Sequence, residues 1–172
     1  MRPEELGDLF RTFKRTAFRL ETLSAYSIDT EAESLRLFRE GQPEPAWRAE
    51  REWLKTVSSA RAAGKLMQRV RLVRLPPSEY VRFEFAWGFP ANVRAGEDIR
   101  VLVVRDEPPP GVLDHDYWLF DDATVVRLEY DQEGRFLRPV AVADPAPYRR
   151  CRDAAMAGAM PFAQYRATVS AS

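Results

Sequence analysis

Hydrophobic positions along the chain follow a helical period in some segments and alternate with polar positions in others. Apolar residues spaced three or four apart predict amphipathic helices, whereas strict alternation predicts strands with one buried face. The predicted helices cover residues 4–14, 30–40, 45–63, 79–87 and the segment from Asp144 to Pro161. The predicted strands are 17–22, 66–74, 99–104, 117–121, 123–130 and 135–143. A continuation of the first helix through Leu20 is the alternative for 17–22, and 88–98 is predicted to be a loop.

The order of these segments indicates the fold class. Helices and strands do not alternate strictly, which favours an α+β fold over an alternating α/β fold. We therefore predict a single α+β domain over residues 1–162, with a mainly antiparallel β-sheet and helices on one face or end. The 99–104 strand is nearly all apolar and should be central, and residues 163–172 are expected to form a frayed tail.

Composition restricts the function classes. The chain has 172 residues, is 45% apolar, and carries 26 basic and 26 acidic residues, so its neutral charge gives no overall attraction to nucleic acid or anionic membranes. Its one cysteine, Cys151, excludes an intrachain disulfide and is expected to be a buried packing residue. No long apolar run predicts a transmembrane helix, and the first residues do not resemble a secretion signal. We expect a cytoplasmic protein.

The stretch "DHDYWLFDDATVVRLEYDQEGR", residues 114–135, holds the only histidine, His115. Asp116 and Asp121 lie at opposite ends of one predicted strand, roughly 16 Å apart, so they cannot share a metal ion. Asp121 and Asp122 are typical turn residues, and "DQEG" predicts a second tight turn. We interpret the stretch as hairpins with Trp118 in the core, and we expect no metal and no cofactor.

An arginine and aromatic face is the first candidate for binding. Arg69 and Arg71 alternate with apolar residues in the 66–74 strand, so we expect them to point away from the core. The candidate binding residues are Arg69, Arg71, Arg82, Tyr80 and Trp87. Such a face could bind RNA or single-stranded DNA by phosphate contact and stacking. The alternative, which near-neutral local charge favours, is a solvated face whose arginines pair with Glu84, Glu97, Asp98 and Glu129.

A catalytic cluster is the second candidate. No G-x-S-x-G motif and no glycine-rich phosphate loop occur in the sequence. A metal-independent nuclease-like or other hydrolytic enzyme would have to use Glu84, Glu97, Arg100 and His115. A deep pocket joining these four residues would favour an enzyme, whereas a flat apolar or arginine-rich face would favour binding.

Five segments carry a resemblance to a known family: "AFRLET" (17–22), "YVRFEFAW" (80–87), "AGEDIRVL" (95–102), "DYWLFDD" (116–122) and "YDQEGRF" (130–136). They are similar to a family of actinobacterial proteins without an established function, and the resemblance extends from about Leu9 to Ala159. Its members often lie near helix-turn-helix regulators. The resemblance implies a non-enzymatic regulatory or interaction protein, with a helix-turn-helix regulator as partner, in a regulatory or toxin–antitoxin-like module. It supplies no catalytic residues.

Overall fold

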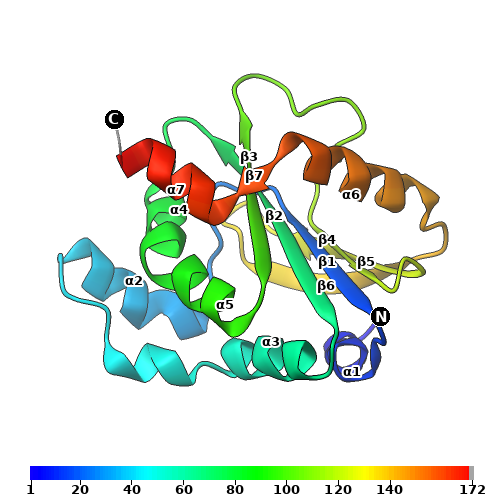
Figure 1. Ribbon diagram of the computed structural model, residues 1–172, viewed down its shortest axis with the longest axis horizontal. Helices are drawn as coiled ribbons and strands as arrows, with labels where there is room; N and C mark the ends of the chain where they lie inside the picture. The colour runs from blue at the N-terminus through cyan, green and yellow to red at the C-terminus, as the bar shows by residue number, and fades with distance from the viewer. Residues whose placement is uncertain (171–172) are drawn as a thin grey trace.

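Seven strands form one mixed β-sheet in the computed structural model, which describes residues 1–170 (Figure 1). The strands are β1 (Thr16–Glu21), β2 (Leu66–Arg74), β3 (Asp98–Val104), β4 (Tyr117–Phe120), β5 (Thr124–Tyr130), β6 (Phe136–Val142) and β7 (Met160–Pro161). Their order across the sheet is β6-β5-β4-β1-β2-β3-β7. β2 pairs in parallel with β1 and β3, and the other neighbours are antiparallel. This arrangement confirms the α+β class.

Helical segments connect and cover these strands. The α-helices are α1 (Pro3–Thr12), α2 (Ala32–Arg39), α3 (Glu52–Ala62), α4 (Glu79–Phe83), α5 (Phe89–Ala95), α6 (Ala146–Gly158) and α7 (Phe162–Ser170). Two 3-10 turns, η1 (Asp29–Glu31) and η2 (Ala46–Glu50), and one π-helical turn, η3 (Glu84–Gly88), complete the set. None of the helices within residues 1–170 has the length and apolar character needed to cross a membrane.

Helices cover both faces of the sheet, and not one face or end as expected from the sequence (Figure 1). On one face, α6 contributes Tyr148, Cys151 and Ala155 to a core with Leu20 and Leu72. The other face carries three separate apolar clusters. The first joins α1 and α3 to the sheet, the second joins α5 and α7 to it, and the third lies around α2, α4 and η3. The space between these three clusters is polar, and it contains the candidate site.

Two predictions for this face were wrong: a predicted loop is largely helical, and a predicted helix is interrupted. Residues 88–98 were expected to be a loop because they contain Gly88, Pro90 and Gly96, but η3 continues directly into α5. Pro90 lies in the first turn of α5, where its missing N–H costs no hydrogen bond. Gly96 ends the helix with a positive φ of 119°, and its N–H donates to the Asn92 carbonyl oxygen.

The predicted helix over 45–63 is interrupted at Arg51. That residue has φ −57° and ψ 136°, an extended conformation that separates η2 from α3. The Arg51 side chain donates from Nε to the Arg48 carbonyl oxygen at 3.0 Å and from Nη2 to Asn92 Oδ1 at 3.4 Å. The second contact spans 41 residues of sequence, so the interruption depends on tertiary structure that helix periodicity cannot show.

The C-terminal segment also differs from its prediction. Residues 163–170, expected to be part of a frayed tail, belong to α7, and Tyr165 is buried there with Phe162. Residues 171 and 172 of the predicted tail lie outside the described residues. The 99–104 strand is confirmed as an interior strand, because β3 pairs with β2 on one side and β7 on the other. Cys151 is fully buried, as predicted.

The 114–135 stretch is confirmed as a pair of hairpins. Asp121 and Asp122 form the β4–β5 turn with positive φ values of 51° and 59°. The Asp121 carboxylate accepts hydrogen bonds from the backbone N–H groups of Lys14, Arg15 and Thr16, at 2.7–3.0 Å. Its role is therefore structural: it holds the start of the central strand β1 against the turn.

Trp118 provides a test of this core. It is buried, as predicted, with the Phe10 ring edge-on at 4.8 Å and the Phe120 ring stacked at 5.8 Å. Trp118→Ala should lower the free energy of unfolding by about 3–5 kcal/mol, because it removes a large aromatic side chain from a packed cluster. Trp47→Ala is the matched control, since Trp47 is 51% exposed. Equal losses in chemical denaturation of the two variants would contradict the packing described here.

Candidate functional site

Charged side chains lie buried at the centre of the sheet, on the face opposite α6. β1 contributes Arg19 and Glu21, and β2 contributes Arg69 and Arg71; the register pairs Arg19 with Arg69 and Glu21 with Arg71. The expectation that Arg69 and Arg71 point to solvent was wrong, because they are only 9% and 0% exposed. Alternation along β2 separates its two faces correctly, but helices cover the charged face as well as the apolar one.

Arg69 joins the sheet to the segment before β3. Its Nη1 donates to Glu21 Oε1 at 2.6 Å, and its Nε donates to Glu97 Oε1 at 2.8 Å. The second oxygen of Glu97 accepts a hydrogen bond from Trp53 Nε1 at 3.1 Å. The guanidinium also lies 5.8 Å from the centre of the Phe89 ring, within cation–π range. One arginine thus ties β1, β2 and the two helices α3 and α5 to one another.

Arg71 is the most deeply buried charge of the site. Its Nε donates to Glu84 Oε2 at 2.9 Å, and its Nη1 donates to the Leu23 carbonyl oxygen at 2.6 Å. Its guanidinium lies 5.3 Å from the centre of the Tyr26 ring. Because Glu84 is the first residue of the π-helical turn η3, this contact fixes the turn over the sheet. A π turn of this kind often occurs at functional sites.

Asp116 holds the other side of the cluster. Its Oδ2 accepts hydrogen bonds from Arg19 Nη2 at 2.8 Å and from the Tyr26 hydroxyl at 2.6 Å. Its Oδ1 accepts from the Thr22 backbone N–H at 2.8 Å and from the Thr22 hydroxyl at 2.7 Å. Tyr130 on β5 accepts a further hydrogen bond from Arg19 Nη2, at 2.9 Å. Asp116 therefore anchors the loop that follows β1.

Protons distribute unequally between the two carboxyl groups that share Arg71. Burial alone would raise the pKa of Glu21, but the charges of Arg69, Arg19 and Arg71 outweigh burial and lower this pKa to about 2. For Glu84, burial dominates and raises the pKa to about 8, while the charge of Arg71 opposes this rise. Glu84 contacts a single arginine and therefore takes up a proton near neutral pH, whereas Glu21 stays ionised.

Some polar atoms of this cluster have no partner. Arg19 Nη1, Glu21 Oε2 and Arg71 Nη2 are buried and make no hydrogen bond within residues 1–170. Buried polar atoms without partners are uncommon in folded proteins, and each one needs an explanation. Arg19 and Glu21 both line a cavity of about 330 Å³ that lies over the charged floor of the sheet.

The cavity is walled by segments that are distant in sequence. Tyr26, Glu31 and Arg51 come from the connections between β1 and β2, and Glu84 and Asn92 come from η3 and α5. The remaining lining residues are Arg19, Glu21, Ile28, Arg69, Tyr80, Phe83, Gly88, Phe89, Tyr130, Gly134 and Phe136. The volume falls at the small end of the range of ligand pockets. Aromatic rings with a few placed polar groups are typical of such pockets.

A close backbone contact completes this wall. Gly134, in the turn of the β5–β6 hairpin, has φ 76°, and an added Cβ would lie 2.5 Å from the Ala25 carbonyl oxygen. The Ser27 N–H donates to the Gly134 carbonyl oxygen at 3.0 Å. Only glycine fits this approach, which closes the loop after β1 against the hairpin. The predicted "DQEG" turn is confirmed, and its glycine forms part of the cavity wall.

The four candidate catalytic residues are not brought together. Glu84 and Glu97 belong to the buried cluster described above. Arg100 shares the α6 face of β3 with Leu102, and it pairs with Asp98 of the same strand at 3.3 Å. His115 lies on the α6 side too, where its Nε2 is 3.3 Å from the Tyr148 hydroxyl. The sheet separates these two residues from the two glutamates.

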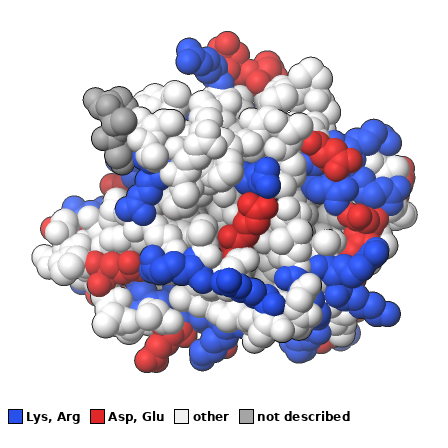
Figure 2. Space-filling view, in the orientation of Figure 1, with Lys and Arg blue, Asp and Glu red and all other residues white. Residues whose placement is uncertain are grey.

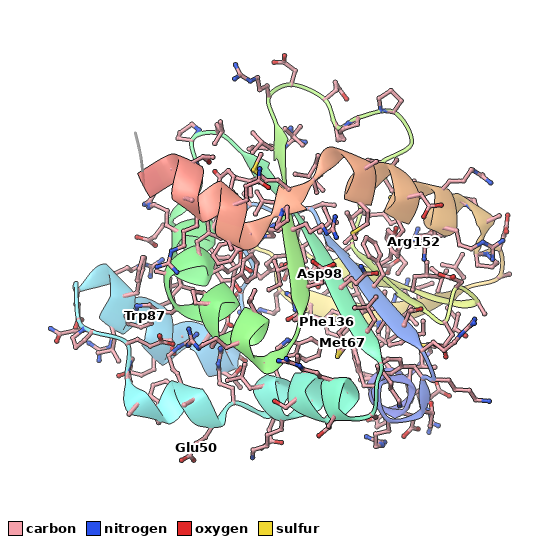
Figure 3. All side chains as sticks on the ribbon, in the orientation of Figure 1. Glu50, Met67, Trp87, Asp98, Phe136 and Arg152 are labelled. Carbon is pink, nitrogen blue, oxygen red and sulfur yellow. The ribbon has the colours of Figure 1, made fainter. Side chains whose placement is uncertain are left out.

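The candidate binding residues are also divided. Arg69 and Tyr80 line the cavity, and Arg71 lies in the same cluster. Trp87 packs against Phe38 of α2 with 5.5 Å between ring centres (Figure 3), and Arg82 is exposed. The set therefore does not form one surface. Figure 2 shows acidic and basic side chains interspersed on the visible side of the molecule, with one basic row over α3 and α5 and further basic side chains near α6.

The alternative of paired arginines is confirmed in its contacts. Glu84 pairs with Arg71, and Glu97 pairs with Arg69; Asp98 and Glu129 likewise pair with arginines. These pairs were expected on a solvated face, however, and the first two are buried. A signal for charge pairing, though not for burial, was present in the sequence, because charged positions alternate with apolar ones in both strands, with Arg19 and Glu21 on β1 and Arg69 and Arg71 on β2.

Other residues of the site had no such signal. Asp116 was interpreted as a strand-end residue, and Tyr26, Glu31 and Arg51 were not singled out. Each of them reaches the cavity or its floor from a loop or an interrupted helix. Their positions depend on how distant segments meet, and no local spacing in the sequence reports that.

Fold and site define an α+β protein with a partly open cavity over a buried arginine–carboxylate cluster. The chain belongs to a family of proteins described as a domain of unknown function, DUF6879, whose sequence pattern matches residues 4–167. This match confirms the resemblance to a family without an established function. A search of curated proteins finds no match to the chain.

Removal of Arg69 should show how far the fold depends on the cluster. Arg69→Met leaves Glu21 and Glu97 buried without their shared cation, so the free energy of unfolding should fall by about 3–5 kcal/mol. The exposed Arg82→Met is the matched control and should change it by less than about 0.5 kcal/mol. Chemical denaturation measures both. Adding Glu97→Gln to Arg69→Met should restore part of the lost free energy of unfolding. A similar loss for Arg69→Met and Arg82→Met would refute the burial argument.

Glu84 should make stability depend on pH. Its pKa is about 8 in the folded protein, whereas the ordinary pKa of a glutamate, expected in the unfolded chain, is 4.5. Between these two pH values the folded state holds a proton that the unfolded state lacks. Stability should therefore fall as pH rises through this window, by up to about 1.4 kcal/mol per pH unit, and level off above it. Glu84→Gln should remove this slope, whereas the exposed Glu133→Gln should keep it. Parallel stability curves for wild type and Glu84→Gln would contradict the assignment.

Proposed function

We propose that this protein is a cytoplasmic, non-enzymatic regulatory protein that binds a small molecule in its central cavity. The observation that carries the proposal is the cavity of about 330 Å³, which aromatic side chains wall in over a charged floor. Within the described residues, no Ser, Thr, Cys, His or Lys lines this cavity. A Ser, Thr or Cys nucleophile and a His or Lys base are therefore not available there, which supports binding over catalysis.

We further propose that binding of the small molecule controls an interaction with a protein partner. Two residues of the cavity wall, Ile28 and Phe136, are themselves 44% and 40% exposed, so a ligand and a partner could contact the same side chains. A helix-turn-helix regulator is the partner that the family resemblance suggests. The actinobacterial origin and the toxin–antitoxin-like module rest on the same resemblance and belong to this proposal.

Cavity filling provides the test of small-molecule binding. An added Cβ at Gly88 meets only Glu84 Cβ, at 4.0 Å, so Gly88, which lines the cavity, is the position at which we introduce a larger side chain, as Gly88→Leu. In a thermal-shift screen of a metabolite library, a ligand should raise the melting temperature of the wild-type protein and leave Gly88→Leu unchanged. Gly7→Leu, in α1 and outside this cavity, is the matched control and should respond like the wild type.

Two results would argue against the proposal. A library without any hit on the wild-type protein would remove the support for a small-molecule site. A hit that stabilises Gly88→Leu as much as the wild type would place the ligand elsewhere. For the partner, co-purification with a helix-turn-helix regulator from the same organism should change when the identified ligand is added, and an interaction that is unaffected by the ligand would argue against ligand-controlled regulation.

A hydrolytic enzyme is the second candidate, and one observation favours it. Glu84 lines the cavity with a pKa raised to about 8 by burial, and general acids and bases work best with a pKa near the working pH. In that case Glu84→Gln should keep ligand binding and abolish conversion of the ligand. Unchanged ligand after prolonged incubation with wild-type protein would favour the binding function.

A further inference from the structure

Two charged residues of the cavity wall differ from all the others. The ions of the floor are engaged with one another: Arg19 pairs with Asp116, Arg69 pairs with Glu21, and Arg71 pairs with Glu84. Arg51 and Glu31 also line the cavity, but neither makes an ion pair within residues 1–170. A half-buried charge without a counter-ion is costly, so this pair marks where a charged ligand would be stabilised most.

The surroundings of Arg51 favour an anionic group. Burial lowers the pKa of Arg51, and the nearby charge of Arg48 lowers it further, which identifies a guanidinium with too little negative charge around it. Its Nε and Nη2 are bound to the Arg48 carbonyl oxygen and Asn92 Oδ1, and these contacts orient the planar head. Its remaining N–H groups suit a carboxylate, which arginine binds through parallel hydrogen bonds.

The surroundings of Glu31 favour a cationic group. Its Oε2 accepts a hydrogen bond from the Tyr80 hydroxyl at 2.7 Å, and this contact holds the side chain at the wall. The charge of Glu31 acts on Arg51, although the two side chains form no ion pair. The cavity wall therefore carries one positive and one negative side chain.

Aromatic rings form much of the remaining wall. Tyr26, Phe83, Phe89, Tyr130 and Phe136 line the cavity together with Tyr80. Such a wall favours an apolar planar group, because aromatic rings gain by edge-to-face and offset contacts beyond the burial of their area. The ligand should therefore combine two opposite charges with a planar apolar part.

We infer that the cavity binds a zwitterionic α-amino acid with an aromatic side chain, its carboxylate on Arg51 and its ammonium group on Glu31. This inference rests on the proposed small-molecule function and specifies the ligand. In a free amino acid the two charges are on neighbouring groups and can bridge the two wall residues together. A peptide separates or neutralises them and cannot do so.

Four probes that share a phenylethyl group separate the two charges. Phenylalanine carries both, hydrocinnamate lacks the ammonium group, phenethylamine lacks the carboxylate, and N-acetylphenylalanine amide carries neither. Isothermal titration calorimetry with the wild-type protein should show phenylalanine binding at least about tenfold more tightly than each of the others, because each lost contact is charge-assisted. This comparison needs no variant, so it stands even where a substitution impairs folding.

Matched variants assign each charge to its residue. Arg51→Met should weaken phenylalanine and leave phenethylamine unchanged, and Glu31→Gln should weaken phenylalanine and leave hydrocinnamate unchanged, by about tenfold in each case. Arg150→Met, exposed on α6, and Glu133→Gln, exposed in the β5–β6 turn, are the controls and should bind like the wild type.

The outcomes distinguish this inference from the proposed function. Equal binding of all four probes, tighter binding of a singly charged probe, or a library hit without either charge would overturn the amino-acid assignment and keep a small-molecule site. If none of the four probes binds but another library compound does, and Gly88→Leu abolishes its binding, the amino-acid assignment is likewise overturned and the small-molecule site is kept. A library with no hit at all would overturn both.

Discussion

The rest of the structure depends on the burial of charged side chains on the two parallel strands β1 and β2. Arg19 and Arg69 lie side by side on β1 and β2, and Arg71 follows on the same face. Transfer of these guanidinium groups out of water costs several kcal/mol each unless carboxylates reach them. The carboxylates come from β1, from η3, from the residue before β3 and from the residue before β4. All these segments must therefore be in place together.

The apolar clusters make this arrangement possible by excluding water on its sides. Trp53, Trp118 and Phe10 pack on one side of the charged floor, whereas Phe89 and Phe162 pack on the other. Several of these rings also face the guanidinium groups, since Arg19 lies 5.7 Å from the Trp118 ring and Arg69 lies 5.7 Å from the Trp53 ring. Aromatic faces stabilise a cation without adding a second charge. The site thus keeps its arginines charged and dry.

The charged residues of the cavity floor differ from those of its wall in how they are paired. Most charges of the floor are held by one another, although Arg19 Nη1, Glu21 Oε2 and Arg71 Nη2 make no hydrogen bond within residues 1–170. The wall ions Arg51 and Glu31 are held by neutral groups and keep their charges unmatched. These unmatched wall charges support the proposed binding function. The raised pKa of Glu84 is the feature that keeps catalysis open as the second candidate.

The sequence by itself determined the elements with strong local signals. Alternation located β1 and β2, the continuous apolar run placed Trp118 in the core, and Asp121 and Gly134 marked the hairpin turns, because side-chain period and backbone conformation are local properties. The sequence also indicated that arginines of this face pair with Glu84 and Glu97, without assigning either glutamate to one arginine. Only the tertiary structure decided that these pairs are buried, because the same alternation describes a face covered by water and a face covered by helices. It also decided the interruption at Arg51, where a contact to Asn92 overrides local helix propensity, and with it the cavity that these distant segments enclose.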